Sequence, residues 1–179
     1  MWNLKEIDNS WTLFLDRDGV INRKRDNDYV KNLSEFEWLP NAVESIVQFG
    51  KKFGLIIIVT NQQGIGKGLM SENDLNQIHS HLKNEIEKAG GRIDAIYFAP
   101  QLKSENSSMR KPETGMAQKA KTEFKNIDFS KSIMVGDSLH DMDFGKRLGM
   151  KTIFISSEIT THQWIDLCFQ NLNEVAVSL

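Results

Sequence analysis

The sequence predicts an α/β protein, built as a Rossmann-like parallel sheet with helices on both faces. Two observations lead to this fold class. Short apolar runs rich in β-branched residues alternate with segments whose apolar residues recur every three or four positions, which is typical of parallel strands joined by helices. The 179 residues also contain no internal repeat, low-complexity tract or linker. We therefore expect one domain spanning residues 1–179.

The predicted strands are apolar runs of four or five residues. The run at 55–59 (LIIIV) is β-branched at nearly every position, so we expect both of its faces to be buried. The run at 12–15 (TLFL) leads directly into the acidic segment DRDG at 16–19. The expected strands lie at residues 12–15, 55–59, 95–98, 132–135 and 152–155, with a weaker one at 166–169.

The predicted helices follow from apolar spacing and from end signals. Ser71 followed by Asp74 resembles a capping box, and an apolar stripe continues at helical spacing until Gly90 and Gly91. Another apolar stripe over 43–53 follows a proline. Two shorter helices are expected at 116–124 and 141–148.

Composition excludes some classes of partner. The net charge of -2 gives no bulk attraction to nucleic acid or anionic lipid, and the apolar run at 55–59 is too short to span a bilayer. The single cysteine, Cys168, cannot form an internal disulfide, and the segment Met1–Glu6 is polar rather than secretory in character. We expect a cytoplasmic monomer that binds neither nucleic acid nor membrane.

Residues 20–38 form a long polar connection after the first strand, with charged residues concentrated at 23–28. Loops of this length in compact domains are often functional. A solvated run of charges is the simpler interpretation, and the residues alone leave both open.

The acidic end of the first strand is the first candidate site. Strand alternation predicts that Asp16 and Asp18 face the same side while Arg17 points away. Two neighbouring carboxylates repel each other unless a cation intervenes, and Mg²⁺ prefers oxygen ligands. The carboxyl end of a strand is also where open α/β sheets bind ligands. Taken alone, the pair could equally close the strand and cap a turn.

Three further segments carry phosphate chemistry after later strands. They contain Thr60-Asn61-Gln62, Arg110-Lys111, and Asp137 with Asp141 one helical turn later. If the strands are parallel, these ends converge on one edge and supply a hydroxyl, a cation and a metal ligand beside the acidic pair. Each has a simpler interpretation: a turn cap for Thr60, a surface lysine for Lys111 and a helix N-cap for Asp137. All of them arising in this order by chance is improbable.

The motifs DRDG (16–19), VTNQ (59–62), RKP (110–112) and GDSLHD (136–141) together resemble the haloacid-dehalogenase superfamily of phosphatases. The longer stretches DRDGVIN, DYV (28–30), TNQQGIGKG (60–68) and RKPETGM (110–116) resemble its heptose bisphosphate and histidinol phosphatase group. The resemblance implies the haloacid-dehalogenase fold with no large cap domain and a Mg²⁺-dependent phosphomonoester hydrolase.

The resemblance also implies a role for each matching residue. Asp16 is the implied nucleophile and a metal ligand; Asp18 is the implied acid and base, with its backbone carbonyl on the metal. Thr60 and Lys111 would hold the phosphoryl group, and Asp137 would complete the metal ligands. The implied substrate contacts are Asp26, Asn27, Asp28, Tyr29, Asn61, Gln62, Gln63 and Arg110, and two residues appear inserted in this chain near the first four.

One departure from the resemblance concerns zinc. Relatives carry Cys-Pro-His and Cys-x-Cys before RKP, whereas this chain reads Ala99-Pro100-Gln101 and Ser107-Ser108-Met109. The residues at these positions bind zinc poorly or not at all, so we expect no structural zinc. One zinc per chain, by elemental analysis after purification without added metal, would overturn this expectation.

Four functions are considered. D-glycero-D-manno-heptose 1,7-bisphosphate is the leading substrate, and histidinol phosphate is a less favoured one. A polynucleotide 3′-phosphatase would need a basic groove. A non-enzymatic receiver-like phospho-acceptor domain would carry its acceptor at a later strand. The segment 64–68 (GIGKG) matches no nucleotide-binding motif and is interpreted as a flexible substrate loop, while His79 and His81 are expected to pack at the surface or the core edge.

Overall fold

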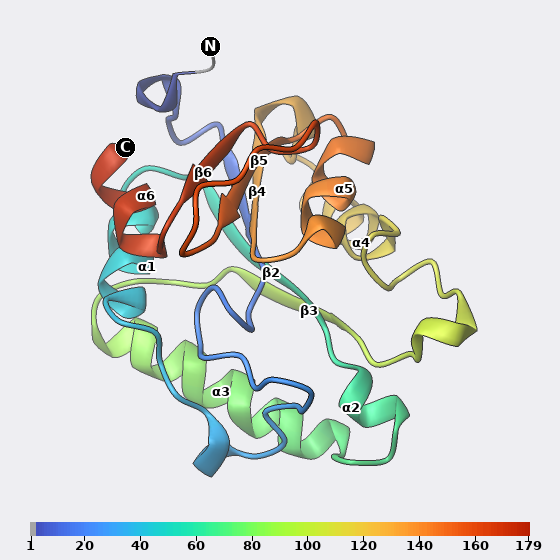
Figure 1. Ribbon diagram of the computed structural model, residues 1–179. Coiled ribbons are helices and arrows are strands. Elements are labelled where there is room, and N and C mark those ends of the chain that lie inside the picture. The colour runs from blue at the N-terminus through green and yellow to red at the C-terminus, as the bar shows by residue number, and fades with distance from the viewer. Residues whose placement is uncertain (1–2) are drawn as a thin grey trace.

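The computed structural model describes residues 3–179, so the first two residues of the polar N-terminal segment lie outside it. Its centre is a sheet of six parallel strands in the order β3-β2-β1-β4-β5-β6 (Figure 1). The strands are β1 Thr12–Leu15, β2 Leu55–Asn61, β3 Ala95–Ala99, β4 Ser132–Gly136, β5 Lys151–Ile155 and β6 Leu167–Phe169. The predicted parallel sheet is confirmed.

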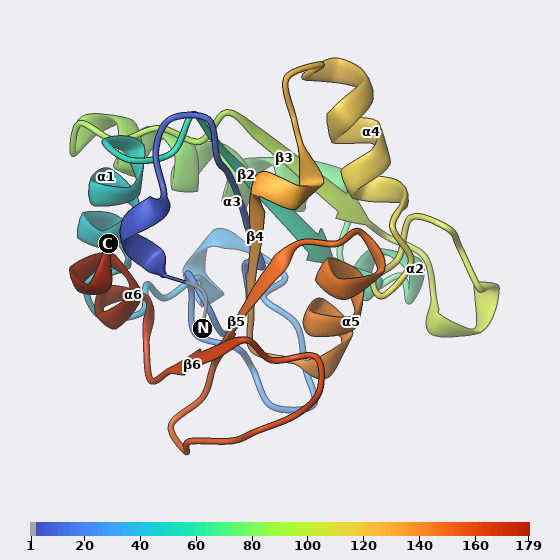
Figure 2. The ribbon, with the colours of Figure 1, turned by 90° about the horizontal axis from the view of Figure 1, so that it is seen from above.

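Helices cover both faces of the sheet (Figures 1 and 2). One apolar cluster joins one side of the strands to α1, α3 and α6, and another joins the opposite side to α4 and α5. The helices are α1 Ala42–Gly50, α2 Gln63–Gly66, α3 Glu72–Lys88, α4 Gly115–Glu123, α5 Leu139–Arg147 and α6 Leu172–Ser178.

Burial of successive residues on opposite faces explains the composition of β2. Ile56 and Ile58 pack into the cluster with α1 and α3, whereas Ile57 and Val59 pack into the cluster with α4 and α5. All four are fully buried. Burying each such side chain contributes about 1.5–3 kcal/mol. The central strands therefore hold both layers together and fix the edge at which they end.

Helix α3 has the predicted end signals. The Ser71 hydroxyl accepts a hydrogen bond from the Asp74 N–H at 3.1 Å, and the Asp74 carboxylate accepts one from the Ser71 N–H at 2.8 Å. The helix ends before Gly90, whose φ of 86° lies in the left-handed region that favours glycine. Its register places His79 toward the interior.

Two segments differ from expectation. The segment 64–68, interpreted from the sequence as a flexible loop, has its first three residues in α2, because β2 continues to Asn61 and Gln62 then starts a helical turn. The connection 20–38 is also more than a solvated charge run. Its Val30 is buried against Met70, Leu75 and Ile78, so the segment is held against α3. Among residues 3–179, no helix is both long enough and apolar enough to cross a membrane.

Candidate active site

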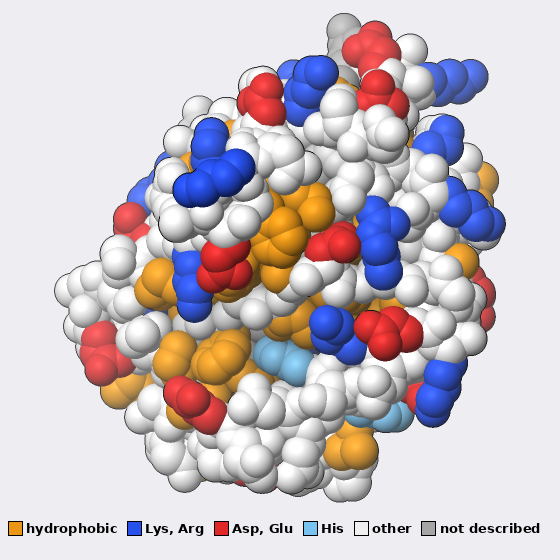
Figure 3. All heavy atoms as spheres, turned by 180° about the vertical axis from the view of Figure 1, so that it is seen from behind, with side chains coloured by type: hydrophobic (Ala, Val, Ile, Leu, Met, Phe, Trp, Pro, Cys, Tyr) orange, Lys and Arg blue, Asp and Glu red, His pale blue; other side chains and the backbone are white. Residues whose placement is uncertain are grey.

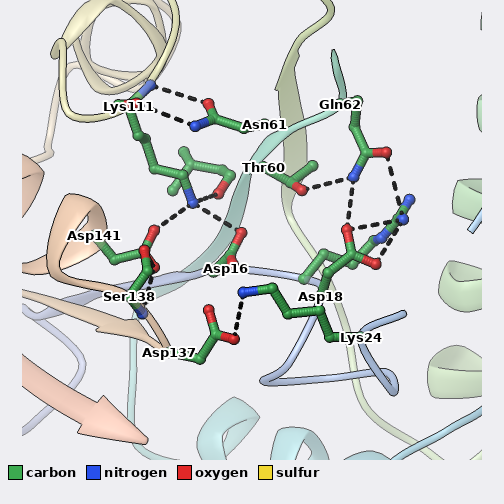
Figure 4. A network of polar contacts seen from close by, with 12 residues as sticks. Asp16, Asp18, Lys24, Thr60, Asn61, Gln62, Lys111, Asp137, Ser138 and Asp141 are labelled. Carbon is green, nitrogen blue, oxygen red and sulfur yellow. Dashed lines mark hydrogen bonds and ion pairs between the residues drawn. The ribbon is translucent and has the colours of Figure 1, made fainter. Parts of the chain in front are cut away.

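A cavity of about 450 Å³ lies at the carboxyl ends of the central strands. Strands β2 and β4 flank β1 with Leu15 level with Ile58 and Val135, so the residues that follow each strand come together. The cavity is lined by Asp16, Asp18, Lys24, Thr60 and Asn61, by seven residues between 103 and 113, and by Asp137, Ser138, His140 and Asp141. Four motifs far apart in sequence therefore meet in one hollow (Figure 4).

Asp16 and Lys111 form the buried centre of this cavity. The Lys111 ammonium lies 2.8 Å from Asp16 Oδ1, 2.6 Å from Asp141 Oδ1 and 2.6 Å from the Val59 carbonyl, so each of its three protons has an acceptor. Burial raises the pKa of Asp16 to about 7; Asp141 and Asp137 also raise it, against the lowering effect of Lys111. Burial lowers the pKa of Lys111, but its contacts with Asp141 and Asp16 outweigh this effect and raise the pKa overall.

Three carboxylates in the cavity have the geometry of a cation site. Asp16, Asp137 and Asp141 each offer an oxygen, and these oxygens lie within 4.8 Å of one another. Asp137 Oδ1 is buried without a hydrogen-bond partner. An orphaned carboxylate oxygen costs free energy unless a donor or a cation reaches it. The donor set therefore fits a hard divalent cation such as Mg²⁺.

Two glycines allow these carboxylates to approach. A Cβ on Gly19 would collide with Asp137 Oδ2, and Gly19 also has a φ of 88°. A Cβ on Gly136 would collide with the Asp141 side chain. The glycines in the motifs DRDG and GDSLHD are therefore explained by the space that the carboxylates occupy.

Lys24 closes the open side of the acidic cluster. Its ammonium lies 2.8 Å from Asp137 Oδ2, and its side chain is 53% exposed. Burial raises the pKa of Asp137 despite this contact, and the nearby carboxylates raise the pKa of Lys24 against the effect of its own burial. Lys24 comes from the connection 20–38, which the sequence left open as functional or merely solvated.

Asp18 faces a different set of partners. Its carboxylate accepts hydrogen bonds from Arg17 at 2.9 and 3.0 Å, from Asn22 at 2.9 Å and from Gln62 at 2.9 Å. Burial would raise the pKa of Asp18, but the Arg17 charge and these hydrogen bonds lower it below its ordinary value. Asp18 lines the same cavity as Asp16, as expected, but its carboxylate is not one of the three in the acidic cluster.

The prediction that Arg17 points away from the acidic pair is wrong. The Arg17 side chain is fully buried and folds back onto Asp18, because β1 ends at Leu15 and strand alternation no longer applies. Its other amine group contacts His79 Nε2 at 3.2 Å. Burial and the Arg17 charge lower the pKa of His79 to about 3, so this buried histidine is neutral.

Side chains at the end of β2, and Gln62 directly after it, organise the cavity. The Gln62 amide donates to the Thr60 hydroxyl at 2.8 Å and is itself buried. The Asn61 side chain makes two hydrogen bonds with the Lys111 backbone, at 3.0 and 3.1 Å. Of the residues expected to contact substrate, Asn61 and Arg110 line the cavity. Among the described residues, the lining does not include Gln62, Gln63 or positions 26–29.

Several of the other residues expected to contact substrate bond to one another or to neighbouring lysines. Gln63 donates to the Tyr29 hydroxyl at 3.0 Å, and Lys67 sits 5.3 Å from the centre of the Tyr29 ring. Asp28 pairs with Lys31 at 2.6 Å. Substrate contact by Asp26, Asn27, Asp28, Tyr29, Gln62 and Gln63 stays a prediction.

Sequence reasoning did not assign Asp141 and Lys24 to the site. The spacing of Asp137 and Asp141 was visible, but Asp141 also makes a capping box with Ser138, so its sequence signal is that of a helix start. Lys24 gave no signal, since its neighbours are also charged.

The chain matches known proteins over nearly its whole length. The family model described as polynucleotide kinase 3 phosphatase matches residues 13–171. The chain is 42% identical over 133 residues to a D-glycero-alpha-D-manno-heptose-1,7-bisphosphate 7-phosphatase of Mycobacterium tuberculosis, covering 74% of this chain and 70% of the relative. It is 37% identical over 163 residues to a Campylobacter jejuni protein of the same name, covering 91% and 92%.

A solved structure supports the same assignment. The D,D-heptose 1,7-bisphosphate phosphatase of B. bronchiseptica, complexed with magnesium and phosphate, superposes with a TM-score of 0.81 at 27% identity, covering 94% of this chain and 96% of the other. The fold, the four motifs and these relatives agree. This chain is a phosphatase of the haloacid-dehalogenase superfamily and belongs to the family that the polynucleotide kinase 3 phosphatase model describes.

Proposed function

We propose that this chain hydrolyses D-glycero-D-manno-heptose 1,7-bisphosphate at its 7-phosphate through an aspartyl-phosphate intermediate on Asp16. The observation that carries the proposal is the convergence of Asp16, Asp137 and Asp141 with the buried Lys111 ammonium in one cavity. The names of the relatives supply the substrate. A cavity of about 450 Å³ is of ordinary size for a small-molecule site.

The metal belongs to the acidic cluster. Asp16, Asp137 and Asp141 would hold Mg²⁺ with the Asp18 backbone carbonyl, and the ion would supply positive charge that favours ionised Asp16 and offsets the charge of the phosphate. The burial that raises the pKa of Asp16 to about 7 makes this charge necessary for a nucleophile that is ionised at neutral pH.

The first chemical step uses Asp16 and Lys111. An Asp16 carboxylate oxygen attacks phosphorus, and the bond from phosphorus to the substrate oxygen breaks. Lys111 and Thr60 hold the phosphoryl oxygens, and Lys111 is already 2.8 Å from the nucleophile. Phosphoryl transfer depends on this placement and on stabilising spread negative charge.

Asp18 acts on the proton in both steps. It protonates the departing oxygen, then takes a proton from the water that cleaves the aspartyl phosphate. Its hydrogen bonds from Arg17, Asn22 and Gln62 favour the ionised form that the second step needs. For the first step we propose that the bound phosphate dianion raises the pKa of Asp18, because nearby negative charge disfavours a second one.

A phosphate-release assay tests this proposal. Purified protein is given Mg²⁺ and, in separate reactions, each anomer of the heptose bisphosphate, histidinol phosphate, or a 3′-phosphorylated DNA oligonucleotide. Fastest release from a heptose bisphosphate, lost with chelator and with Asp16→Asn, is the expected result. Preference for the oligonucleotide would replace the proposed substrate, and a stable phosphoprotein without turnover would favour the receiver-like alternative.

The face shown in Figure 3 gives no support to the binding of a polynucleotide. On the face shown in Figure 3, acidic and basic side chains are interspersed rather than gathered into a basic strip. Binding a nucleic-acid backbone depends on clustered lysines and arginines. The oligonucleotide arm of the assay tests this point directly.

A further inference from the structure

Two lysines face the acidic cluster, and they are held very differently. Lys111 is 2% exposed and donates to three oxygens, so it is a fixed part of the site. Lys24 is 53% exposed, and its hydrogen bond to Asp137 is the only one the described residues give its ammonium. Its reach comes from a flexible side chain on the connection 20–38. The Lys24 ammonium can therefore move away from the acidic cluster, whereas the Lys111 ammonium is held in place.

Asp137 uses only one of its two oxygens. Oδ2 accepts from Lys24, whereas Oδ1 is buried without a partner and belongs to a carboxylate of the candidate cation site. Lys24 enters from the cavity side and points its ammonium at Asp137, beside Asp16 (Figure 4). The contact neutralises one carboxylate of a crowded group and leaves the other oxygen unsatisfied.

A divalent cation and the Lys24 ammonium cannot both occupy this side of Asp137 at close range. Like charges a few ångströms apart repel, and the Asp137 side chain, only 16% exposed, is largely shielded from screening by water. The half-exposed side chain offers an escape into solvent at small cost, since pairs of this exposure contribute little.

We propose that Lys24 is a built-in competitor for the metal site: its ammonium holds Asp137 in the absence of metal and is displaced when Mg²⁺ binds. Lys24 thereby lowers the affinity for Mg²⁺ and keeps the acidic cluster paired until metal arrives. The inference rests on the metal site of the proposed function, but not on the identity of the substrate.

The consequence for metal affinity is measurable without substrate. Titration calorimetry with Mg²⁺ alone compares the wild type with Lys24→Met, and Lys103→Met serves as the control. Lys103 lines the same cavity, but the described residues give its side chain no ion pair. Lys24→Met is expected to bind Mg²⁺ about two- to fivefold more tightly, the range set by breaking a half-exposed ion pair. Lys103→Met is expected to change the affinity less than Lys24→Met does.

Displacement itself has a second readout. Amine acetylation at pH 8, quantified by peptide mass spectrometry, reports how free each lysine is. Mg²⁺ is expected to speed acetylation of Lys24 and to leave Lys103 unchanged. In Asp137→Asn, Lys24 is expected to react rapidly with or without Mg²⁺.

The outcomes separate this inference from the proposed function. Equal or weaker Mg²⁺ binding by Lys24→Met, or Lys24 acetylation that does not respond to Mg²⁺, overturns the competitor role while the phosphatase proposal stands. If the wild type binds no Mg²⁺, both the competitor role and the proposed metal site fail. Loss of phosphate release with normal Mg²⁺ titrations would instead count against the proposed substrate or chemistry alone.

Discussion

Asp16 and Asp18 lie two residues apart, yet replacing each by asparagine is expected to change the free energy of unfolding in opposite directions. Burial raises the pKa of Asp16 to about 7, so the folded protein resists ionising it. The unfolded chain ionises the same group near 3.8. Between these two values the folded state holds a proton that the unfolded state has lost, so stability falls as the pH rises through this window.

The size of the effect follows from the shift. Each pKa unit corresponds to 1.36 kcal/mol. Burying Asp16 therefore costs the metal-free fold about 4 kcal/mol at pH 8, where the group is ionised, and about 2 kcal/mol at pH 5.5, where the fold keeps it protonated. Asp16→Asn mimics the neutral acid and is expected to raise the free energy of unfolding by about these amounts. For a protein of this size, 4 kcal/mol corresponds to a rise in Tm of about 8–16 °C.

Urea unfolding in the presence of chelator, at pH 8, 5.5 and 4, measures the effect. The matched control is Asp18→Asn, which removes a carboxylate that accepts charged hydrogen bonds and is expected to destabilise the fold by about 1–3 kcal/mol at pH 8. A stabilisation by Asp16→Asn that is absent, or that does not shrink toward pH 4, would refute the reasoning.

Three other changes follow from the geometry of the site. Gly19→Ala should weaken Mg²⁺ binding by at least about tenfold in calorimetry, because its Cβ would displace Asp137. Gly68→Ala is the control: its φ of 70° gives similar backbone strain, but no atom lies within 4 Å of the added Cβ, so the affinity for Mg²⁺ should not change. The wild type should lose about 2 kcal/mol of unfolding free energy between pH 7.5 and pH 5 that His79→Gln does not lose. Folded His79, with a pKa of about 3, cannot take up the proton that the unfolded chain binds below about 6.5. A difference between the two proteins that does not depend on pH would contradict this. Gln62→Leu should lower kcat about tenfold with little change in KM, since it removes the donor to Asp18, the proposed acid and base, and to the Thr60 hydroxyl, which we propose holds the phosphoryl group. A rise in KM with unchanged kcat, in steady-state kinetics, would show instead that Gln62 binds the substrate itself.

The strands and the convergence of the motifs could be predicted because both depend on local patterns and one topological rule. Residues after parallel strands meet at one edge, which brings Asp16, Thr60 and Asp137 to the same cavity. The short helix at Gln63–Gly66 could not be predicted, because two glycines in four residues oppose helix formation and tertiary contacts decide the outcome.

Side-chain direction beyond the strand ends was the main limit. Strand alternation describes β1 only as far as Leu15, and the turn that follows carries Arg17 back onto Asp18. Lys24 reaches Asp137 because its segment is held against α3 through Val30, a contact between distant parts of the chain. Such placement depends on packing that neither spacing nor composition encodes.

The paired hydrogen bonds between the Asn61 side chain and the Lys111 backbone fix the position of Lys111 separately from the shape of the loop before it. They tie the cation directly to the end of β2, independently of the residues 100–109 that precede it. Lys103, Asn106 and Ser107 of that stretch line the cavity, so a change there alters the cavity wall while the Lys111 ammonium stays beside Asp16 and Asp141. The cavity wall can therefore change without moving the lysine away from the carboxylates.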